Sequence, residues 1–544
     1  MTGRRIVDHD VVVVGGGHNG LVCAAYLVRA GLSVCVVEAR SEVGGCAGSD
    51  SVFGSRVNIC NCDHSLVRTL PLIDELQLAD HGLRYIDLDP GQVALGWDAP
   101  GPVPLFRDVE RTLDAVAVHF PDEVAGYRRY AADAIPMASL VLELASRVPT
   151  SAAMARKALG ESRAATRLLR WSRRSVGEVL RSYFGHDGLL GPAMAGGPAV
   201  WGLSSTTPGT GLGALAYGFK HVAPVGRPVG GSGALTDALA SRVLAGGGEI
   251  RTSSRVTGIL CEHGVDGGGV RAVTVRRADA ADSSRPADAV DPVDPVDPVD
   301  PVDRSGCGSE VSITTSAVVV ACDPRRAIVE YLRNPPPGAA SLIERWRDRE
   351  PGGGYESKID AVLGQLPRWK HSADARLADS VGFEDHLSPS TIVAPGLAAI
   401  DQAHELMGRG RIAERPMLFI NAPSVLDRSV APDGKHLLSI EVLFTPYRLE
   451  GGWPAVGDAK GEPRRWLEVA ATLFEPGFLD SVERWRAVTP VDYERDFNMP
   501  KGHAASYAGG PVAAFLGRDP ELSRYETPIP GLYLTGAATF PGAG

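Results

Sequence analysis

The residues of this sequence with the clearest chemical meaning are glycines spaced to let a backbone approach a phosphate. Gly15, Gly17 and Gly20 form a G-x-G-x-x-G pattern directly after the apolar run 11–14. In such a pattern the first glycine permits a tight turn, the second lets the backbone approach a pyrophosphate, and the third lets the next helix pack closely on the sheet. The spacing therefore predicts a dinucleotide-binding turn.

A strand, a helix and a second strand must position these glycines. The β-branched run 11–14 predicts a strand buried on both faces of a parallel sheet. The apolar segment 21–30 predicts a helix whose N-terminal amides face an anion. The second strand, 33–37, ends at Glu38, where a carboxylate can accept hydrogen bonds from an adenosine ribose. An acid at this position disfavours a ribose 2′-phosphate.

Composition limits the class of protein. A length of 544 residues predicts two sequential or intertwined domains. The formal net charge of −10 argues against nucleic-acid binding, which needs a basic face. The 8 cysteines form no C-x-x-C pair, which fits a reducing cytoplasm. No window approaches the roughly eighteen apolar residues of a spanning helix, so we expect a cytoplasmic protein.

A second glycine pair, Gly44-Gly45, follows Glu38 after a short linker. It allows another backbone approach along the path of a flavin dinucleotide, and so favours FAD. Here the chain resembles the phytoene-desaturase-like branch of the FAD-dependent amine oxidase and carotenoid desaturase superfamily, in which an acid, a short basic linker and a Gly-Gly pair follow the Rossmann glycines. Cys46 stands where that family often has arginine, a departure that disfavours the amine oxidases proper.

The other end of the chain resembles the second FAD motif of the family. Residues 532–535 predict a strand that runs into a glycine loop. In the family the glycine at the place of Gly536 approaches the pyrophosphate and ribityl chain, and the turn at Pro541-Gly542 borders the flavin ring. The family continues into a helix that points at the flavin pyrimidine, so a chain that is short at this end, stopping at Gly544, predicts weaker flavin binding.

The resemblance implies an α/β fold, with a Rossmann-like FAD-binding domain of the glutathione reductase type and an inserted α+β substrate or cap domain. The FAD-binding domain is expected over 1–70, 225–330 and 505–544, and the cap over 71–224 and 331–504. Val-Asp-Pro copies within 285–305 predict a disordered insertion, because each proline removes a hydrogen-bond donor and the aspartates repel one another.

The motifs and the resemblance together also define the expected cofactor contacts. The predicted FAD-binding residues are Gly15, Gly17, His18, Asn19, Gly20, Glu38, Ala39, Arg40, Gly44, Gly45, Cys46, Val256, Gly536, Ala537, Pro541 and Gly542. In the family the backbone near the position of Val256 meets the adenine.

Two histidines, His64 and His503, are the candidate acid–base groups. The segment that contains His64 passes near the flavin ring in the family, and the alternative interpretation is a loop histidine bonded only to the protein. Cys60 and Cys62 lie close to His64 in the sequence, but this spacing matches no usual zinc pattern, so no metal site is predicted.

The stretch 155–181 is rich in arginine and interleaved with apolar residues. Such a basic amphipathic stretch can lie on an anionic bilayer, and the solvated face of a cap helix is the alternative interpretation. Peripheral membrane contact is therefore a hypothesis, and the sequence leaves the oligomeric state open.

These features predict a FAD-dependent oxidoreductase, a dehydrogenase or desaturase. The glycine-rich segment 201–221 resembles the cavity lining of the family, which implies a lipophilic small-molecule substrate. The sequence has only one G-x-G-x-x-G motif between a predicted strand and a predicted helix, so no second site for NAD(P)H is expected. The flavin is therefore expected to pass its electrons to oxygen, a quinone or another acceptor. Two alternatives stay open, namely an amine oxidase and a flavin-poor relative that acts through protein contacts.

Overall fold

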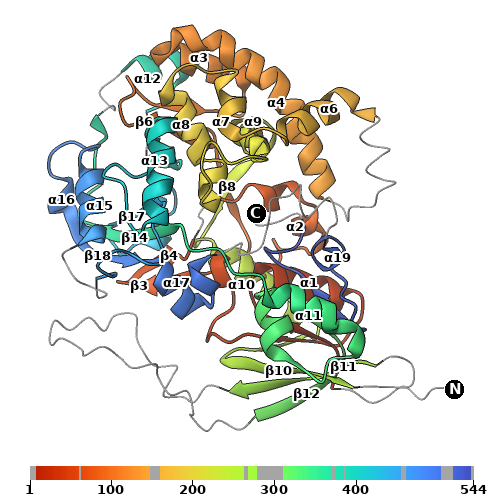
Figure 1. Ribbon diagram of the computed structural model, residues 1–544. Coiled ribbons are helices and arrows are strands. Elements are labelled where there is room, and N and C mark those ends of the chain that lie inside the picture. The colour runs from red at the N-terminus through yellow and green to blue at the C-terminus, as the bar shows by residue number, and fades with distance from the viewer. Residues whose placement is uncertain are drawn as a thin grey trace.

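The computed structural model describes residues 8–60, 63–146, 160–262, 268–277, 310–370, 375–384, 387–454, 461–503 and 519–540. The predicted Val-Asp-Pro insertion at 285–305 lies outside these residues. Two sheets organise the described chain: one in the lower part of Figure 1, and one near the middle, beneath a layer of helices.

The first sheet has eight strands in the order β13-β10-β11-β12-β1-β2-β9, with β19 paired to β12. Their bounds are β1 His9–Val14, β2 Val34–Val37, β9 Glu249–Arg251, β10 Ser254–Glu262, β11 Gly269–Arg277, β12 Glu310–Val320, β13 Leu332–Arg333 and β19 Leu532–Leu534. β1 is central and pairs in parallel with both β2 and β12. Its four valines are buried, as predicted for a strand covered on both faces.

Helices cover both faces of this sheet. α1 (His18–Arg29) and α10 (Gly233–Ala245) share one apolar cluster with the sheet, and α11 (Ala340–Arg347) belongs to the cluster on the other face. α2 (Leu72–Glu75) also packs with the first cluster through Leu72. α2 and α11 thus lie with the dinucleotide-binding sheet, although the predicted boundaries at 70 and 330 assigned them to the cap, because their apolar side chains are buried on this body.

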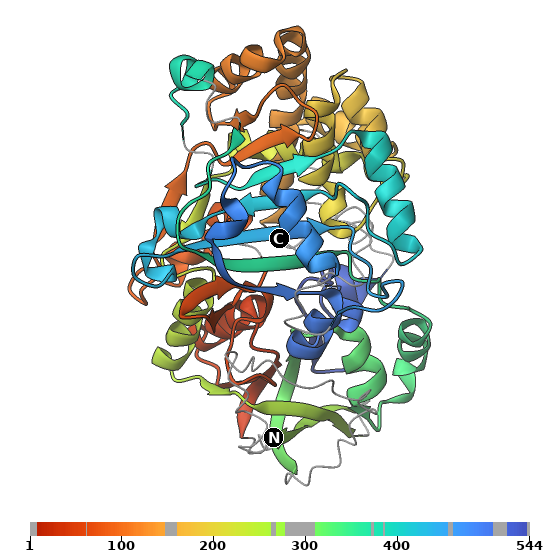
Figure 2. The same ribbon diagram turned by 90° about the vertical axis from the view of Figure 1, so that its left-hand side faces the viewer.

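The second sheet has seven strands in the order β18-β14-β17-β16-β15-β6-β7. Their bounds are β6 Gln92–Gly96, β7 Val103–Leu105, β14 Glu356–Leu363, β15 Thr391–Ala394, β16 Leu418–Asn421, β17 His436–Leu443 and β18 Val482–Val488. Figure 2 shows these strands crossing the middle of the molecule, above the first sheet. One face is apolar and buries Ile359 and Ile440 against Trp466 of α15 (Glu462–Ala471).

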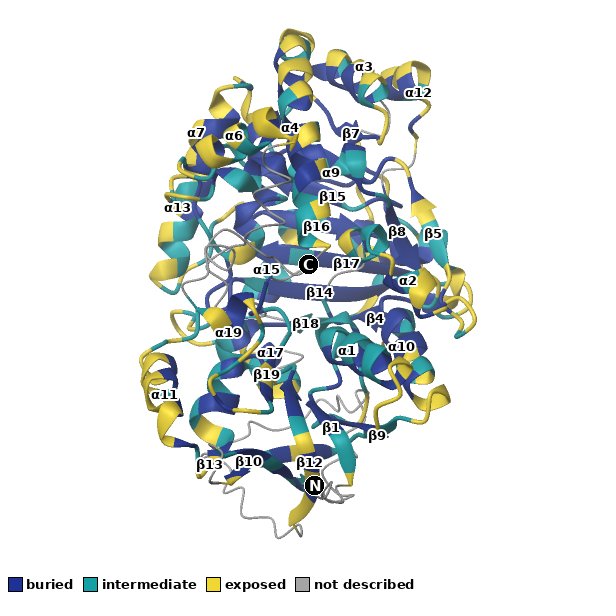
Figure 3. Ribbon diagram, turned by 90° about the vertical axis from the view of Figure 1, so that its right-hand side faces the viewer, coloured by how far each residue is buried: buried dark blue, intermediate teal, exposed yellow. Residues whose placement is uncertain are grey.

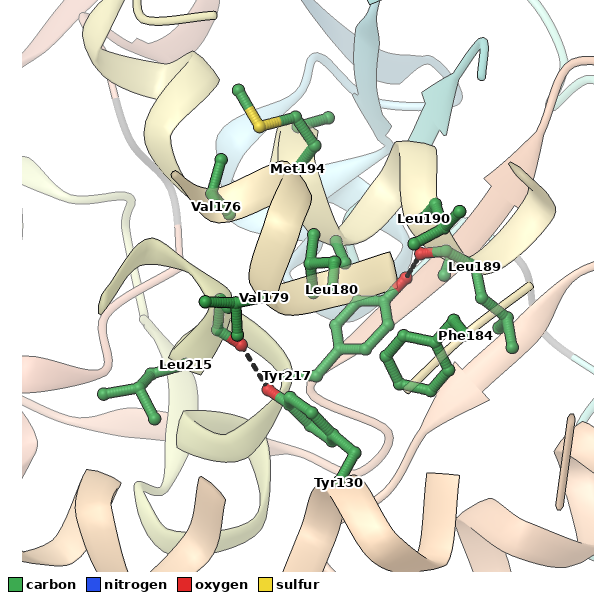
Figure 4. Close-up of a cluster of buried hydrophobic side chains, with 14 of the residues drawn as sticks. Tyr130, Val176, Val179, Leu180, Phe184, Leu189, Leu190, Met194, Leu215 and Tyr217 are labelled. Atoms are coloured by element: carbon green, nitrogen blue, oxygen red, sulfur yellow. Dashed lines mark hydrogen bonds between the residues drawn. The ribbon is translucent and has the colours of Figure 1, made fainter. Parts of the chain in front are cut away.

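A helical layer completes the cap. It consists of α3 (Val109–His119), α4 (Val124–Ala145), α6 (Ser162–Trp171), α7 (Val176–Arg181), α8 (Asp187–Ala195), α9 (Ala216–Val222), α12 (Ala375–Val381) and α13 (Leu397–Gly408). Its core holds buried aromatic rings whose hydroxyls are satisfied by the backbone: Tyr130 donates to Ala214 O at 2.5 Å, and Tyr217 donates to Leu189 O at 2.9 Å (Figure 4).

Short elements complete the described fold. They include the hairpin β3 (Ser49–Val52) and β4 (Ser55–Asn58), the pair β5 (Tyr85–Leu88) and β8 (Val225–Pro228), and the helices α14 (Pro423–Leu426), α16 (Phe478–Ser481), α17 (Pro490–Phe497) and α19 (Pro520–Ser523). Figure 3 shows that the cap sheet is largely buried, whereas the outer helices expose one side to solvent. Among the described residues, no helix combines the length and apolar character needed to span a bilayer.

Candidate cofactor-binding and active site

The glycine turn between β1 and α1 has the geometry of a phosphate cradle. Gly15 adopts a φ of +106° and donates its amide to Val37 O at 2.8 Å, which ties the turn to β2. A Cβ at Gly20 would lie 2.1 Å from Gly15 O. Only glycine allows the helix to approach the turn so closely, which is the packing role predicted from the sequence.

Gly17 leaves the N-terminus of α1 open. It is the N-cap of the helix at φ −70°, and a Cβ built there would meet no atom of the described residues closer than 3.9 Å. The backbone N–H groups of the first turn, which includes His18 and Asn19, have no intrahelical acceptor. Because unpaired amides and the helix dipole both favour negative charge, this end of α1 suits a pyrophosphate.

Gly44 and Gly45 lie beside this turn. The Gly44 amide donates to Gly16 O at 2.8 Å, and Gly44 forms an isolated bridge with Gly17. Gly44 has a φ of +120°, and a Cβ there would lie 2.8 Å from the Cα of Gly48. The second glycine pair is therefore required by the fold as well as by any backbone approach to a ligand.

Glu38 is held at the end of β2 by the cradle itself. Its two carboxylate oxygens accept the amides of Gly16 at 2.7 Å and Arg40 at 2.8 Å, and the residue is 9% exposed. A carboxylate oxygen has a second lone pair, so these bonds fix the acid without using its full acceptor capacity. Ala39 lies between Glu38 and Arg40, which this second hydrogen bond joins.

The closing strand β19 brings the far end of the chain to the same place. It pairs in parallel with β12, and Thr535 donates its amide to Val320 O at 2.8 Å. The next residue, Gly536, has a φ of +108°. A Cβ on Gly536 would meet Ala321 O at 3.6 Å, and a Cβ on Gly15 would meet the same oxygen at 3.2 Å. Two glycine loops separated by most of the sequence thus meet around Ala321.

The structure describes some of the remaining predicted contact residues. Ala537 follows Gly536 in the described chain, whereas Pro541 and Gly542 lie outside the described residues. Arg40 is paired with Asp50 at 3.3 Å. Val256 lies on β10, two residues after Ser254, whose amide donates to Glu38 O at 2.8 Å. The strand predicted to meet the adenine therefore lies beside Glu38, the acid predicted to bind the ribose.

These observations fit an adenine dinucleotide. Backbone amides are offered by the glycine turn, the open end of α1 and the second glycine loop, and such amides suit phosphates. The anchored carboxylate of Glu38 suits the diol of a ribose. Gly15, Gly17, Gly20 and Glu38 would hold the adenine and pyrophosphate half of FAD, and Gly536 would border the pyrophosphate. When bound, the flavin supplies hydride or single-electron acceptance.

Of the two candidate histidines, His64 is buried and His503 is partly buried, and both lie beside the protein's own groups. His64 contacts the Tyr85 hydroxyl through Nδ1 at 2.9 Å and the Ser232 hydroxyl through Nε2 at 3.1 Å, and burial lowers its pKa to about 4. Burial also lowers the pKa of His503 to about 4, and its ring packs edge-on against Tyr355, with ring centroids 4.9 Å apart. Both imidazoles are therefore neutral at physiological pH, and their catalytic roles stay predictions.

Cys62 lies outside the described residues, so the metal interpretation of the Cys60–His64 segment has no structural test. Among the residues that the structure describes, His9, Cys35 and Glu249 are the one group of three donors close enough to share an ion. The Glu249 carboxylate already pairs with Arg251 at 2.6 Å, and His9 lies 3.1 Å from it. These contacts account for the group as an ion-pair network at the far end of the sheet.

The second face of the cap sheet is polar and turns towards the cradle. Lys358 of β14 is 2% exposed, and its ammonium group pairs with Asp360 at 2.5 Å and donates to the carbonyl of Asn58 on β4. Asp360 also pairs with Arg486 of β18 at 3.1 Å. Arg486 in turn lies 3.5 Å from Asp50, the partner of Arg40. This chain of charges joins the cap sheet to the linker behind Glu38.

Two glutamates stand on the same polar face. Glu356 lies two residues before Lys358 on β14, and Glu441 lies opposite Lys358 on β17. Burial raises the pKa of Glu356 to about 7, an effect that Lys358 partly offsets. Burial and then the charge of Glu356 raise the pKa of Glu441 to about 8. This pair is not predicted from the sequence, because its members lie on separate strands and only their registry brings them together.

Cys46 and Cys60 connect the pair to the cofactor cradle. Cys46 directly follows Gly45, and its thiol lies 3.8 Å from the sulfur of Met499. A hydrogen bond from Cys46, burial, and the nearby Glu356 and Glu441 raise the pKa of the Cys60 thiol well above its usual range. Cys46 and Cys60 pack in one cluster, and Lys358 contacts Asn58, two residues before Cys60. The polar face of the cap sheet therefore approaches the segment that follows the second glycine pair.

The described part of the basic stretch lies on α6 and α7. Ala164 and Trp171 of α6 are buried in the cap, and Leu169 is 62% exposed. Arg167 pairs with Asp133 at 2.6 Å, whereas Arg163, Arg170 and Arg173 are exposed on the outer side. The apolar face of α6 thus packs on the protein, and the basic face is turned to solvent.

The fold and the site together define a flavoprotein class, in which a Rossmann-like FAD-binding domain carries an inserted cap of mixed sheet and helices. Residues 20–345 match the model of the flavin-containing amine oxidoreductase family. The chain belongs to this family and is a FAD-dependent oxidoreductase.

Similar proteins span nearly the whole chain. Pyridine nucleotide-disulfide oxidoreductase domain-containing protein 2 of Mus musculus is 27% identical over 100% of this chain and 92% of its own length. One subunit of the limonene dehydrogenase of Castellaniella defragrans is 24% identical over 98% of this chain and 91% of its own length. A solved structure of putrescine oxidase shares the fold, with a TM-score of 0.55, 14% identity, and coverage of 97% of this chain and 93% of that chain.

Proposed function

We propose that the protein is a dehydrogenase or desaturase of the phytoene-desaturase-like type that oxidises a lipophilic small molecule. Electrons pass from the substrate to bound FAD and then to oxygen, a quinone or another acceptor. The observation that carries the proposal is the contact between the polar face of the cap sheet and the hairpin beside the dinucleotide cradle, where Lys358 donates to the Asn58 carbonyl. A substrate held between these two surfaces would be separated from bulk water.

The similar proteins support the choice of substrate class. The limonene dehydrogenase of Castellaniella defragrans is named for a hydrocarbon substrate, and its matching subunit aligns with nearly the whole chain. A prolycopene isomerase of Arabidopsis thaliana is 31% identical over 134 residues, which is 23% of this chain. The sequence also contains one G-x-G-x-x-G context, so an external acceptor is a simpler route for the electrons than a second bound nucleotide.

Anaerobic reduction of the FAD-loaded protein tests the proposal. A panel of unsaturated and saturated hydrocarbons, lipophilic alcohols and amines is mixed with the protein, and the flavin absorbance is followed. We expect one of the lipophilic non-amine compounds to bleach the flavin, with the oxidised product recovered in equal amount. Bleaching by amines alone would refute the lipophilic assignment.

An amine oxidase is the second candidate, and one observation favours it. Glu356 and Glu441 add two acidic groups to a polar face where Lys358 is already paired with Asp360. At least one ionised carboxylate there would attract an ammonium group. Release of hydrogen peroxide with an amine, and with no hydrocarbon or alcohol, would establish this alternative.

A flavin-poor relative that acts through protein contacts is the third candidate. Limited proteolysis with and without FAD separates it from the enzymes, because a ligand that binds only the native state stabilises it. Protection by FAD supports the proposal, and an unchanged digestion pattern supports the non-catalytic candidate. His64→Gln and His503→Gln variants then test the predicted acid–base groups: retained flavin reduction in both would exclude these histidines from that role.

A further inference from the structure

We propose that Glu356 and Glu441 form a proton-sharing carboxylate pair that accepts the proton lost by the substrate during its oxidation. The inference rests on the proposed function, since it assigns the residues that serve the same site. Neither residue belongs to the motifs that bind the dinucleotide.

Strand registry brings the two carboxylates together. In the antiparallel pair β14 and β17, Lys358 is opposite Glu441, and Glu356 is opposite Leu443. Side chains two residues apart on a strand point to the same face, so Glu356, Lys358 and Glu441 share one face and the two glutamates are diagonal neighbours. This is the face that meets the dinucleotide-binding body through Asn58.

The groups around the pair favour a shared proton. Lys358 is the nearest cation, but its ammonium group is already engaged by Asp360 and by the Asn58 carbonyl. Arg486, the next cation on this face, pairs with Asp360. The other titratable neighbours are Asp63 and the weak acids Cys46, Cys60, Tyr355 and Tyr493, none of which supplies positive charge. Two carboxylates at close range in such surroundings cannot both ionise easily.

The pair is also available to a substrate. Among the described residues, neither glutamate has a hydrogen bond or an ion pair that would occupy its carboxylate. Burial dominates the pKa shift of each, yet both side chains keep part of their surface accessible. The two glutamates are therefore not sealed within a core. Lys358, which shares their face, donates to the Asn58 carbonyl of the hairpin beside the cradle, so the pair is turned towards the dinucleotide-binding body.

The chemistry of a two-electron oxidation requires such a group. Removal of a hydride equivalent to the flavin leaves one proton to be taken from the substrate. As the C–H, O–H or N–H bond of the substrate breaks, its proton forms an O–H bond with the ionised carboxylate of the pair. The electron pair of the broken bond stays with the substrate and forms the new double bond. A base with a pKa near the working pH performs this transfer most effectively.

Infrared spectroscopy of the FAD-loaded protein tests the inference without a known substrate. A protonated carboxylic acid has a carbonyl band distinct from that of a carboxylate. We expect such a band to be present in the wild type at neutral pH and to disappear at alkaline pH. In Glu441→Gln the acid with the higher pKa is removed, so the band should weaken at neutral pH. In Glu356→Gln the charge of Glu356 no longer raises the pKa of Glu441, so the band should disappear at a lower pH than in the wild type.

Glu468→Gln, on the outer helix α15, is the matched control and should keep the band. FAD affinity should be unchanged in all three variants. With a substrate found in the anaerobic panel, flavin reduction should slow by roughly 10²–10⁴-fold in the two pair variants, as for the loss of a general base. A band with the same intensity and the same pH of disappearance in both pair variants as in the wild type would overturn the inference while leaving the proposed function intact. Failure of the wild type to retain FAD would instead contradict the function.

Discussion

Gly17→Ala separates the two reasons for which a glycine can be needed in a phosphate turn. The native φ of −70° is favourable for alanine, and in the part of the chain that the structure describes the new Cβ would meet no atom closer than 3.9 Å. The protein without cofactor should therefore keep its stability to within about 0.5 kcal/mol. The methyl group would, however, stand at the open N-terminus of α1, where the pyrophosphate is expected to approach.

The magnitude follows from the bonds that the methyl group would displace. A hydrogen bond to a charged group contributes about 1.5–3 kcal/mol, so the loss of one amide–phosphate bond should weaken FAD binding roughly 10- to 150-fold. With FAD at about 100 times its wild-type Kd, stabilisation by the ligand should fall from about 2.7 kcal/mol to about 0.4 kcal/mol for a hundredfold weaker variant.

Equilibrium unfolding with and without FAD, together with flavin fluorescence titration, measures both quantities. Gly20→Ala is the contrasting variant, because its Cβ would lie 2.1 Å from Gly15 O and should destabilise the protein even without cofactor, by about 1–3 kcal/mol. If Gly17→Ala bound FAD as tightly as the wild type, the assignment of this turn to the pyrophosphate would be refuted.

Further predictions concern the polar face and the basic helix. Lys358→Met should lower the free energy of unfolding by about 3 kcal/mol, measured by chemical denaturation, because it leaves a buried carboxylate with one cation fewer. The raised pKa of Glu441 means that the folded state binds more protons than the unfolded state, so stability should fall as pH rises from about 4.5 to about 8, and Glu441→Gln should flatten this slope in denaturation at graded pH. If the basic stretch contacts membranes, replacement of Arg163, Arg170 and Arg173 by Glu should abolish co-sedimentation with anionic vesicles; a wild type that does not pellet would end that hypothesis.

The cradle could be predicted from the sequence because its parts are local. The strand at β1, the glycine spacing, the helix and Glu38 lie within one βαβ unit, where the order of residues nearly determines the geometry. The second glycine loop at Gly536 was predicted by resemblance, and its approach to Ala321 depends on parallel pairing of β19 with β12, which spacing alone does not determine.

The carboxylate pair could not be predicted in the same way. Glu356 and Glu441 come together only through the antiparallel registry of β14 and β17, and a shift of one residue would turn either side chain to the opposite face. Likewise, the apolar residues of α2 and α11 predict burial but do not indicate which body buries them. The domain boundaries therefore differ from those expected, although the fold class is confirmed.

The absorbance spectrum of the protein after incubation with FAD and removal of free cofactor tests the central claim most directly. The arrangement of Gly15, Gly17, Glu38 and Gly536 predicts a retained flavin spectrum in about a one-to-one ratio to protein, with resolved bands that indicate a site shielded from water. Loss of all flavin absorbance with the free cofactor would contradict the assignment of this protein as a FAD-dependent oxidoreductase.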